Sequence, residues 1–355
     1  MGERNLDYKL EGRLSNAHDR KVHDPRLKKR MAILFIFIAL TVFSILYGLV
    51  LGSVSIPITK VWDALTHNGT TMDSQIVWNL RLPRILTGLL VGACLAVSGA
   101  LLQGLMKNPL ADPGIIGVSA GAGLVAVIMM VLFPTMIYLL PLGAFIGALL
   151  ATVIIYTVAW QGGISPVRMV LAGIAINSLL GAVMSCIMIL YSDRVQSVLP
   201  WLVGGLSGRS WPHFSIIWPY ALIGLVLSVF AIKHANIMVL GDDVARLLGS
   251  KVERSRLFLI LLSTFLAGAA VSVAGLITFV GLVVPHIVRM LVGNDYRYLL
   301  PISAIGGAFL VTIADTVARS WFDPIELPVG ILLAMLGAPF FLYLLRGGFK
   351  GWKMS

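Results

Sequence analysis

Long apolar runs alternate with charged or Pro- and Gly-rich breaks along most of the chain. About 20 consecutive apolar residues suffice for a helix to cross the hydrocarbon core of a bilayer. The pattern therefore predicts an all-α integral membrane protein with about ten transmembrane helices. We place them at residues 31–52, 85–106, 115–134, 138–160, 168–190, 213–232, 257–280, 282–292, 300–319 and 328–346. The eighth is short and follows the seventh almost directly, so the boundaries around 280–292 stay open.

The polar breaks divide the chain into three parts. Residues 1–30 hold nine Lys or Arg and five Asp or Glu, and the apolar run that follows is longer than the core of a signal peptide. We expect a cytosolic N-terminal arm at 1–30, a transmembrane domain at 31–346 and a cytosolic tail at 347–355. Within the domain, the Gly-rich piece 192–209 is expected to hold a short helix at the membrane surface.

Basic residues indicate how the helices are oriented, because cytosolic loops of membrane proteins carry an excess of Lys and Arg. With the N-terminus in the cytosol, 21 Lys and Arg fall on the inner side and six on the outer side. This distribution favours an N-in, C-in protein with an even number of spans. The outer residues need another explanation, and they are Lys60, Arg81, Arg84, Arg194, Arg209 and Arg319.

A faint internal repeat links two of the predicted helices. Residues 92–99 (GACLAVSG) parallel residues 268–275 (GAAVSVAG), and a proline follows ten residues later in both copies, Pro109 and Pro285. By the span count the two helices run in opposite directions, which is typical of the inverted repeats of transporters. Chance similarity between Gly- and Ala-rich helices is the alternative.

Composition supports a lipid environment. Hydrophobic residues make up 58% of the 355 positions and charged residues 12%, whereas a soluble protein carries about 25% charged residues. The net charge of +11 collects beside the apolar runs and forms no basic face with interleaved aromatic residues, so we expect no nucleic-acid partner. Cys94 and Cys186 lie inside apolar runs and build neither a disulfide framework nor a metal-ligand pattern.

No catalytic or nucleotide-binding motif is found in the sequence. HExxH, CxxC, GxSxG in a strand-turn-helix context and the GxxxxGK[ST] phosphate loop are all missing. The glycine-rich stretch 117–123 has no strand before it, and close helix packing explains it better than phosphate binding. His286 is expected to be structural, because no other ligand stands near it. Energy for active transport would have to come from another chain.

Three of the outer arginines are candidates for contact with an external partner. Arg81 and Arg84 flank Pro83, which suits the start of a helix, and Arg319 ends the ninth span. Arginine pairs bidentately with carboxylates, so docking is one interpretation, and snorkelling or contact with lipid phosphate is the other. Asp315 lies one helical turn before Arg319. We expect these two to pair, since an intramembrane carboxylate needs a partner, and the pair would compete with docking.

The longest inner loop, 236–256, is predicted to contain a short helix with acidic residues at its start and a glycine after its end. The apolar residues that share one face of it are Val244, Leu247 and Leu248. An exposed apolar face needs a partner protein or the inner leaflet. The near-zero net charge of 242–249 argues against the leaflet.

The segment 108–114 (NPLADPG) separates the second and third spans. Two prolines and a glycine forbid a continuous helix there. Irregular backbone at membrane depth is tolerated where it is buried or lines a water-filled path. The segment is therefore either a gate or a plain turn.

Taken in order, eight segments resemble the permease subunits of the ATP-binding-cassette (ABC) importers for iron-siderophores, haem and cobalamin. They are RLPR at 81–84, GACLAVSG at 92–99, NPLADPG at 108–114, GDDVARLLG at 241–249, GLVVPHIVR at 281–289, ADTVAR at 314–319, ELPVG at 326–330 and GAPF at 337–340. Each segment is weak alone, but the ordered set is specific. The resemblance covers residues 31 to 346, which is nearly everything but the arm.

The resemblance implies a multi-pass protein of a bacterial cell membrane that contacts membrane lipid and works in an assembly. It implies ten spans per subunit, a homo- or heterodimer of permeases with the pathway between them, two cytosolic ATPase subunits that hold ATP and Mg, and an external substrate-binding protein. No catalytic role, cofactor or metal is implied on this chain. Docking of the binding protein would use Arg81, Arg84 and Arg319. The implied ATPase-coupling residues are Gly241, Asp242, Ala245, Leu247, Leu248 and Gly249, and the implied inner-gate residues are Asn108, Leu110, Gly163 and Ser165.

The residues do not identify the cargo, because the predicted pathway walls are generic Gly, Ala, Ser and Leu. A ferric siderophore is favoured as the commonest cargo of the resembled class, with haem and cobalamin as alternatives. A secondary transporter driven by an ion gradient would need intramembrane charged relays, and Asp315 is nearly the only candidate. An intramembrane enzyme would need a nucleophile and base or a metal set, and neither is found.

Overall fold

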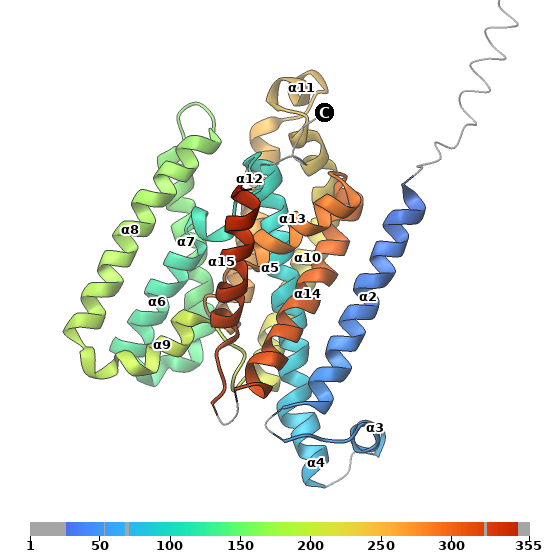
Figure 1. Cartoon of the computed structure of the whole chain (residues 1–355). Helices are drawn as coiled ribbons and strands as arrows, with labels where there is room; N and C mark the ends of the chain where they lie inside the picture. The colour runs from blue at the N-terminus through green and yellow to red at the C-terminus, as the bar shows by residue number, and fades with distance from the viewer. Residues whose placement is uncertain (1–25, 53, 68–70, 323–324, 347–355) are drawn as a thin grey trace, which may run out of the picture.

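The computed structural model describes residues 26–52, 54–67, 71–322 and 325–346, which form an all-helical bundle (Figure 1). Residues 1–25 of the predicted arm and the whole predicted tail, 347–355, lie outside the described residues. The first helix, α2 (Leu27–Val50), begins four residues before the predicted boundary at 31. The end of the predicted arm is therefore helical.

Each of the ten predicted spans coincides with a helix. These are α2, α5 (Leu82–Leu105), α6 (Val118–Leu132), α7 (Leu140–Ala159), α8 (Pro166–Leu190), α10 (Trp211–Val239), α12 (Val252–Ala274), α13 (Val280–Val292), α14 (Tyr296–Ser320) and α15 (Val329–Arg346). Within the described part of the chain, seven helices are long and apolar enough to cross a membrane, and α6, α13 and α15 are shorter apolar helices. The chain is thus an all-helical membrane protein.

Shorter helices connect the long ones. They are α3 (Ile58–His67), α4 (Met72–Gln75), the π-helix η1 (Ile76–Arg81), the 3-10 helices η2 (Pro113–Ile116), η3 (Pro134–Leu139) and η4 (Ser192–Arg194), α9 (Val195–Val203) and α11 (Asp242–Leu247). Helix α9 confirms the short helix expected in 192–209. Between α5 and η2 the chain is irregular, as the prolines of 108–114 predict.

Two predicted boundaries differ from the helix ends in the structure. The predicted loop 236–256 shrinks to 240–251, since α10 continues to Val239 and α12 begins at Val252. The predicted seventh span, 257–280, ends early at Ala274, because Gly275 adopts a φ of +71° that only glycine adopts readily.

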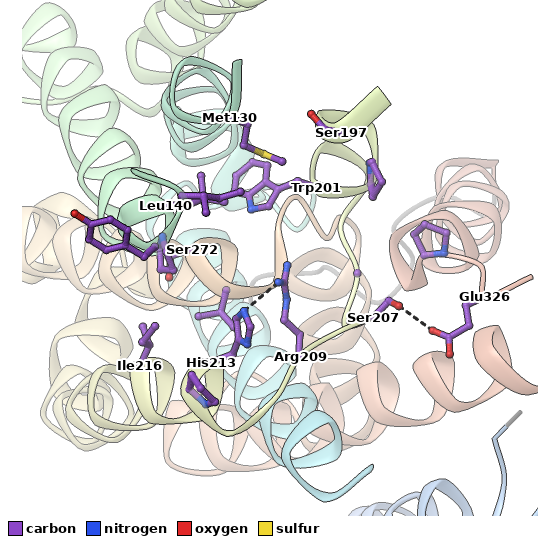
Figure 2. A pocket seen from close by; sticks show the side chains of 18 residues that line it. Met130, Leu140, Ser197, Trp201, Ser207, Arg209, His213, Ile216, Ser272 and Glu326 are labelled. Carbon is purple, nitrogen blue, oxygen red and sulfur yellow. Dashed lines mark hydrogen bonds between the residues drawn. The ribbon is translucent and has the colours of Figure 1, made fainter. Parts of the chain in front are cut away.

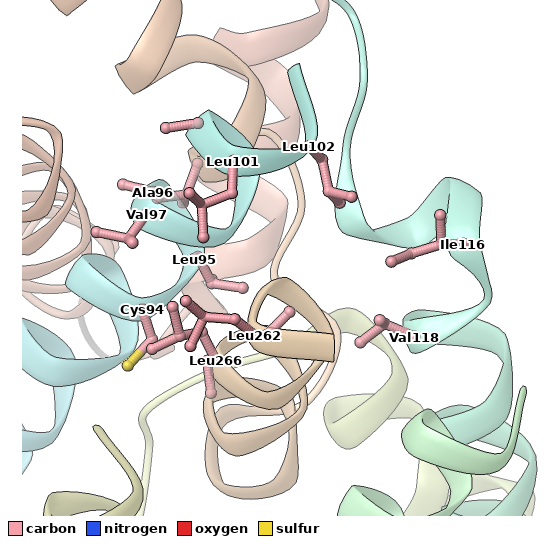
Figure 3. Close-up of a cluster of buried hydrophobic side chains, with 14 of the residues drawn as sticks. Cys94, Leu95, Ala96, Val97, Leu101, Leu102, Ile116, Val118, Leu262 and Leu266 are labelled. Carbon is pink, nitrogen blue, oxygen red and sulfur yellow. The ribbon is translucent and has the colours of Figure 1, made fainter. Parts of the chain in front are cut away.

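Helices α5 and α12 lie at the centre of the bundle and run antiparallel, as the repeat predicts (Figure 1). Their middles meet where the hydroxyls of Ser98 and Ser263 lie 2.7 Å apart. Apolar side chains surround this contact, and Figure 3 labels Cys94, Leu95, Leu101, Leu262 and Leu266 among them. Helix α14 packs against α5, and α7 packs against α12.

The glycines of the first repeat copy permit close helix contact. A Cβ atom added at Gly92 would lie 2.1 Å from the carbonyl oxygen of Gly307, and one at Gly99 would lie 1.9 Å from that of Gly281. Both distances are too short for any side chain, so α14 and α13 approach α5 through bare backbone. In the second copy, Gly275 instead ends its helix.

The bundle has two distinct ends (Figure 1). The beginning of α2, the end of α15 and helix α11 lie at one, which we call the α11 end. Helices α3, α4 and α9 lie at the other, which we call the α9 end. The chain therefore begins and ends its described part on the same side of the bundle.

Candidate functional site

Four arginines and a glutamate line a cavity of about 290 Å³ at the α9 end. We call it the arginine pocket, and its charged residues are Arg81, Arg84, Arg209, Arg319 and Glu326. They come from five different segments: η1, the first turn of α5, the loop after α9, the last turn of α14 and the loop before α15. The structure thus brings together all three predicted docking arginines.

The sequence interpretation missed two members of this pocket. Arg209 was counted among the outer basic residues but was not selected, and Glu326 stands in the segment ELPVG of the resemblance. The signal that could have identified Arg209 was its position on the outer side, against the charge rule, directly after the Gly-rich 204–208.

Arg84 is the centre of a buried ion-pair network. Its Nε and Nη2 atoms donate to the two carboxylate oxygens of Asp315 at 2.8 and 2.9 Å. Its Nη1 atom donates to Glu326 at 2.9 Å, and Glu326 also accepts from the hydroxyl of Ser207 at 2.9 Å. The predicted pairing of Asp315 with Arg319 is therefore wrong, because Arg84 fits both carboxylate oxygens with its planar fork.

Arg81 and Arg319 instead cap the end of α2. The last four carbonyl groups of a helix have no partner within the helix, and basic side chains can satisfy them. Arg81 donates to the carbonyl oxygens of Leu49 at 2.5 Å and Val50 at 2.9 Å, and Arg319 donates to that of Gly48. Two of the outer arginines thus have a structural explanation besides docking.

The arginine pocket is short of negative charge. Arg84 takes both nearby carboxylates, while Arg81 and Arg319 donate only to uncharged carbonyl groups and Arg209 donates to His213 at 3.3 Å. Burial, and then the charge of Arg84, lower the pKa of Arg209 below its ordinary value. Like charges held this closely would be stabilised by an added carboxylate.

Glu326 stays ionised in this setting. Burial alone would raise the pKa of its carboxyl, but the Arg84 guanidinium and the hydrogen bond from Ser207 outweigh burial and hold it below the ordinary value.

A larger cavity of about 770 Å³ adjoins the arginine pocket (Figure 2). Ser207, Arg209 and Glu326 line both. The rest of the wall is largely apolar and includes Met130 and Trp201, with His213 beside Arg209 (Figure 2). The α9 end is therefore hollowed, with its charge gathered on one side of the hollow.

The predicted short helix with an exposed apolar face is confirmed as α11. Gly241 precedes it with a φ of +103° and Gly249 follows it with a φ of +73°. Ala245 is fully buried against the bundle, whereas the exposed fractions of Val244, Leu247 and Leu248 are 43%, 88% and 61%. An apolar face this exposed needs a partner protein or lipid to cover it.

Asp242 fastens this helix to the bundle. Its carboxylate lies 2.6 Å from Arg256 and 3.5 Å from Lys107. Burial would raise its pKa, but the hydrogen bond and charge of Arg256 and the charge of Lys107 lower the pKa below its ordinary value. Asp242 is therefore negatively charged at neutral pH.

The four predicted gate residues lie in two turns at the α11 end. Asn108 is exposed and accepts the N–H of Leu110 at 2.9 Å through its side chain. Gly163 has a φ of +145°, its carbonyl oxygen accepts from Arg168 at 3.0 Å, and Ser165 precedes α8. No group of three or more His, Cys, Asp or Glu in the described ranges could hold a metal ion.

Comparison with known proteins agrees with this architecture. The FecCD transport family matches residues 40–347. The chain is 42% identical over 328 residues to a probable siderophore transport system permease protein of Bacillus subtilis (strain 168), covering 90% of this chain and 95% of the relative. It is 40% identical over 330 residues to a hemin transport system permease protein of Yersinia pestis, covering 90% and 96%.

A solved structure of a metal-chelate type ABC transporter in an inward-facing conformation has the same fold. The two sequences are 30% identical. The structural alignment covers 89% of this chain and 99% of the solved chain, with a TM-score of 0.80. These matches confirm the resemblance, and they make the chain a non-catalytic, multi-pass membrane permease of a bacterial-type ABC importer, for which no cofactor is expected. The chain belongs to the FecCD transport family.

Proposed function

We propose that this chain imports a ferric siderophore as one subunit of a permease dimer, with haem and cobalamin as the alternative cargoes. The observation that carries the choice of cargo is its 42% identity to a siderophore permease over nearly the full length of both chains. As an ABC importer permease, the chain supplies the membrane path, and hydrolysis of ATP belongs to a partner subunit.

The ten-span, N-in and C-in topology is supported by the ends of the bundle. The described chain begins and ends at the α11 end (Figure 1), which an even number of crossings requires. We infer that the α11 end is cytosolic, because Lys28, Lys29, Lys107 and Arg168 lie there or beside it. The arginines of the arginine pocket break the charge rule, but they are held by helix capping, ion pairs and, for Arg209, a hydrogen bond to His213.

The inverted repeat is supported by the antiparallel pair α5 and α12. Each is central, and their neighbours correspond, because α14 packs against α5 and α7 packs against α12, while α10 packs against both. Inverted repeats of this kind give a transporter two related halves that can move against each other.

The dimer is supported by α8, the long helix that the bundle covers least. In the most apolar 18-residue stretch of α8, only 6% of the residues are buried. In the corresponding stretch of Met72–Leu105, which includes α5, 83% are buried. Its exposed face carries small residues at helical spacing, namely Ala175, Ser178, Ala182 and Ser185. Small residues allow a second helix to approach closely in a membrane, so we place the partner permease and the pathway on this face.

The arginine pocket is the proposed docking site for the external binding protein, through Arg81, Arg84 and Arg319, with Arg209 added. Its excess positive charge and its position at the α9 end support this role. The exposed apolar face of α11 is the proposed contact with the cytosolic ATPase. The turns at 108–110 and 163–165 are the proposed inner gates, because both lie beside the α11 contacts.

Uptake in a strain that lacks the chain's own gene tests the cargo. Complementation with this chain should restore uptake of labelled ferric siderophore and should not change uptake of labelled haem or cobalamin. Restored uptake of haem or cobalamin alone would contradict the siderophore proposal and keep the importer class.

A further inference from the structure

Arg256, in the second turn of α12, joins three segments of the chain. Its exposed fraction is only 4%. Its Nη2 atom donates to Asp242 of α11 at 2.6 Å. Its Nη1 atom donates to the carbonyl oxygen of Ile164 at 2.6 Å and to Glu253 at 2.9 Å. One guanidinium therefore contacts α11, α12 and the turn between α7 and α8.

A second contact strengthens the link to that turn. Glu253 accepts the backbone N–H of Ile164 at 3.4 Å through its other carboxylate oxygen. Arg256 and Glu253 thus hold both polar backbone groups of Ile164, and they also hold each other. The neighbouring residues are Gly163 and Ser165, which belong to one proposed gate.

Asp242 extends the network to the other proposed gate. Its second carboxylate oxygen lies 3.5 Å from Lys107. Lys107 has a left-handed backbone, with a φ of +47°, and directly precedes Asn108. The α11 helix is consequently bound through one carboxylate to the beginning of the 108–110 turn and, through Arg256, to the 163–165 turn.

We propose that Arg256 is the positioning residue that transmits a displacement of α11 to the turn at 160–165, with Asp242 and Glu253 as its two carboxylate contacts. The proposal rests on the proposed function, in which the ATPase acts on α11. A buried guanidinium that loses its acceptors is left uncompensated, which is costly. The segments it joins therefore move together more readily than they separate.

The test uses the full complex of this chain with its ATPase in lipid vesicles. A spin label is attached at an introduced cysteine, Gln161→Cys, because Gln161 is exposed in the turn itself. The exposed Cys186 is replaced by serine, and the buried Cys94 stays. The readout is the ATP-dependent change in label mobility for a fixed amount of bound ATPase.

Two variant pairs make the test specific. Arg256→Lys keeps the positive charge but loses the planar guanidinium that donates to several acceptors at once. Arg254→Lys is its matched control, because Arg254 is exposed on the same helix. Asp242→Asn is compared with Asp243→Asn, whose carboxylate is exposed and has no ion pair with a described residue. We expect Arg256→Lys and Asp242→Asn to reduce the ATP response about tenfold, as the loss of a charge-assisted hydrogen bond would, and the two controls to keep it.

ATPase co-purification with the parent chain and thermal unfolding of each variant are measured first. Failure of the ATPase to bind the parent chain would overturn the proposed function and this inference with it. If the ATPase binds and the variants fold, an ATP response in Arg256→Lys equal to that of the parent would overturn this inference but not the proposed function. A parent complex with no ATP response at position 161 would also overturn it.

Discussion

Arg84 and Asp315 stand 231 positions apart in the sequence and form a buried bidentate ion pair, with N–O distances of 2.8 and 2.9 Å. The pair fastens the first turn of α5 to the last turns of α14 at the α9 end. Asp315 is thus paired within the chain, as a carboxylate at membrane depth needs to be.

Asp315→Asn should destabilise the chain strongly. The substitution leaves the guanidinium of Arg84 without its main counter-charge, and removing one partner of a buried ion pair costs about 3–5 kcal/mol. Thermal unfolding of the purified protein in detergent measures the effect. Asp73→Asn is the control, because its ion pair with Lys60 is exposed and should matter little. If both substitutions lowered the unfolding midpoint equally, the buried pair of Arg84 and Asp315 would contribute no more to stability than the exposed pair.

Removing positive charge from the arginine pocket should weaken binding of the external protein. We expect Arg209→Gln and Arg319→Gln each to raise the Kd of the binding protein about tenfold, since each removes a charge from a pocket built to attract carboxylates. The Kd should also rise with ionic strength. Binding to the reconstituted complex measures both effects.

Arg194→Gln is the matched control for this docking prediction. Arg194 lies near the same end of the bundle, donates to Val131 and does not line the arginine pocket. A Kd that changes equally in all three variants, or in none of them, would argue against docking at this pocket.

Leu247→Asp should abolish coupling to the ATPase without affecting the fold. The side chain of Leu247 is 88% exposed, and surface substitutions usually change stability by less than about 0.5 kcal/mol. We expect an unchanged unfolding midpoint, together with loss of ATPase co-purification and of uptake. Full uptake in this variant would refute the role of α11.

The stabilising effect of Glu326 should depend on pH in a defined direction. Its pKa in the folded chain is held below the ordinary value, which is about 4.3. Its contribution to stability is therefore complete above that value and is lost as the pH falls through the lower, folded pKa. The difference in unfolding midpoint between the parent and Glu326→Gln should be constant from about pH 8 to pH 5.5 and should shrink as the pH falls below about 4.

The exposed Asp63 provides the control for this titration. Asp63→Asn should change the unfolding midpoint little, because substitutions at the surface usually change stability by less than about 0.5 kcal/mol. A difference for Glu326→Gln that grows as the pH falls would contradict the assigned direction of the pKa shift.

The positions of the long helices could be predicted because a membrane helix needs a continuous apolar run, and such runs are visible in any sequence. Their ends were harder to place. Helix α10 continues through polar residues to Val239, and α12 stops at Gly275 within an apolar stretch. Hydropathy does not report backbone conformation, and it is the positive φ of a glycine that ended α12.

The sequence by itself determined that the chain is a helical membrane protein, that it carries arginines on the side opposite to most of its basic residues, and that the loop after α10 holds a short helix with Leu247 on its apolar face. Only the tertiary structure decided which charges meet. Asp315 had an arginine one turn away in its own helix, yet it pairs with Arg84 of another helix, and Arg319 caps α2 instead. Ion pairs follow from distances and orientations in space, and contacts between residues 231 positions apart leave no mark in a local pattern.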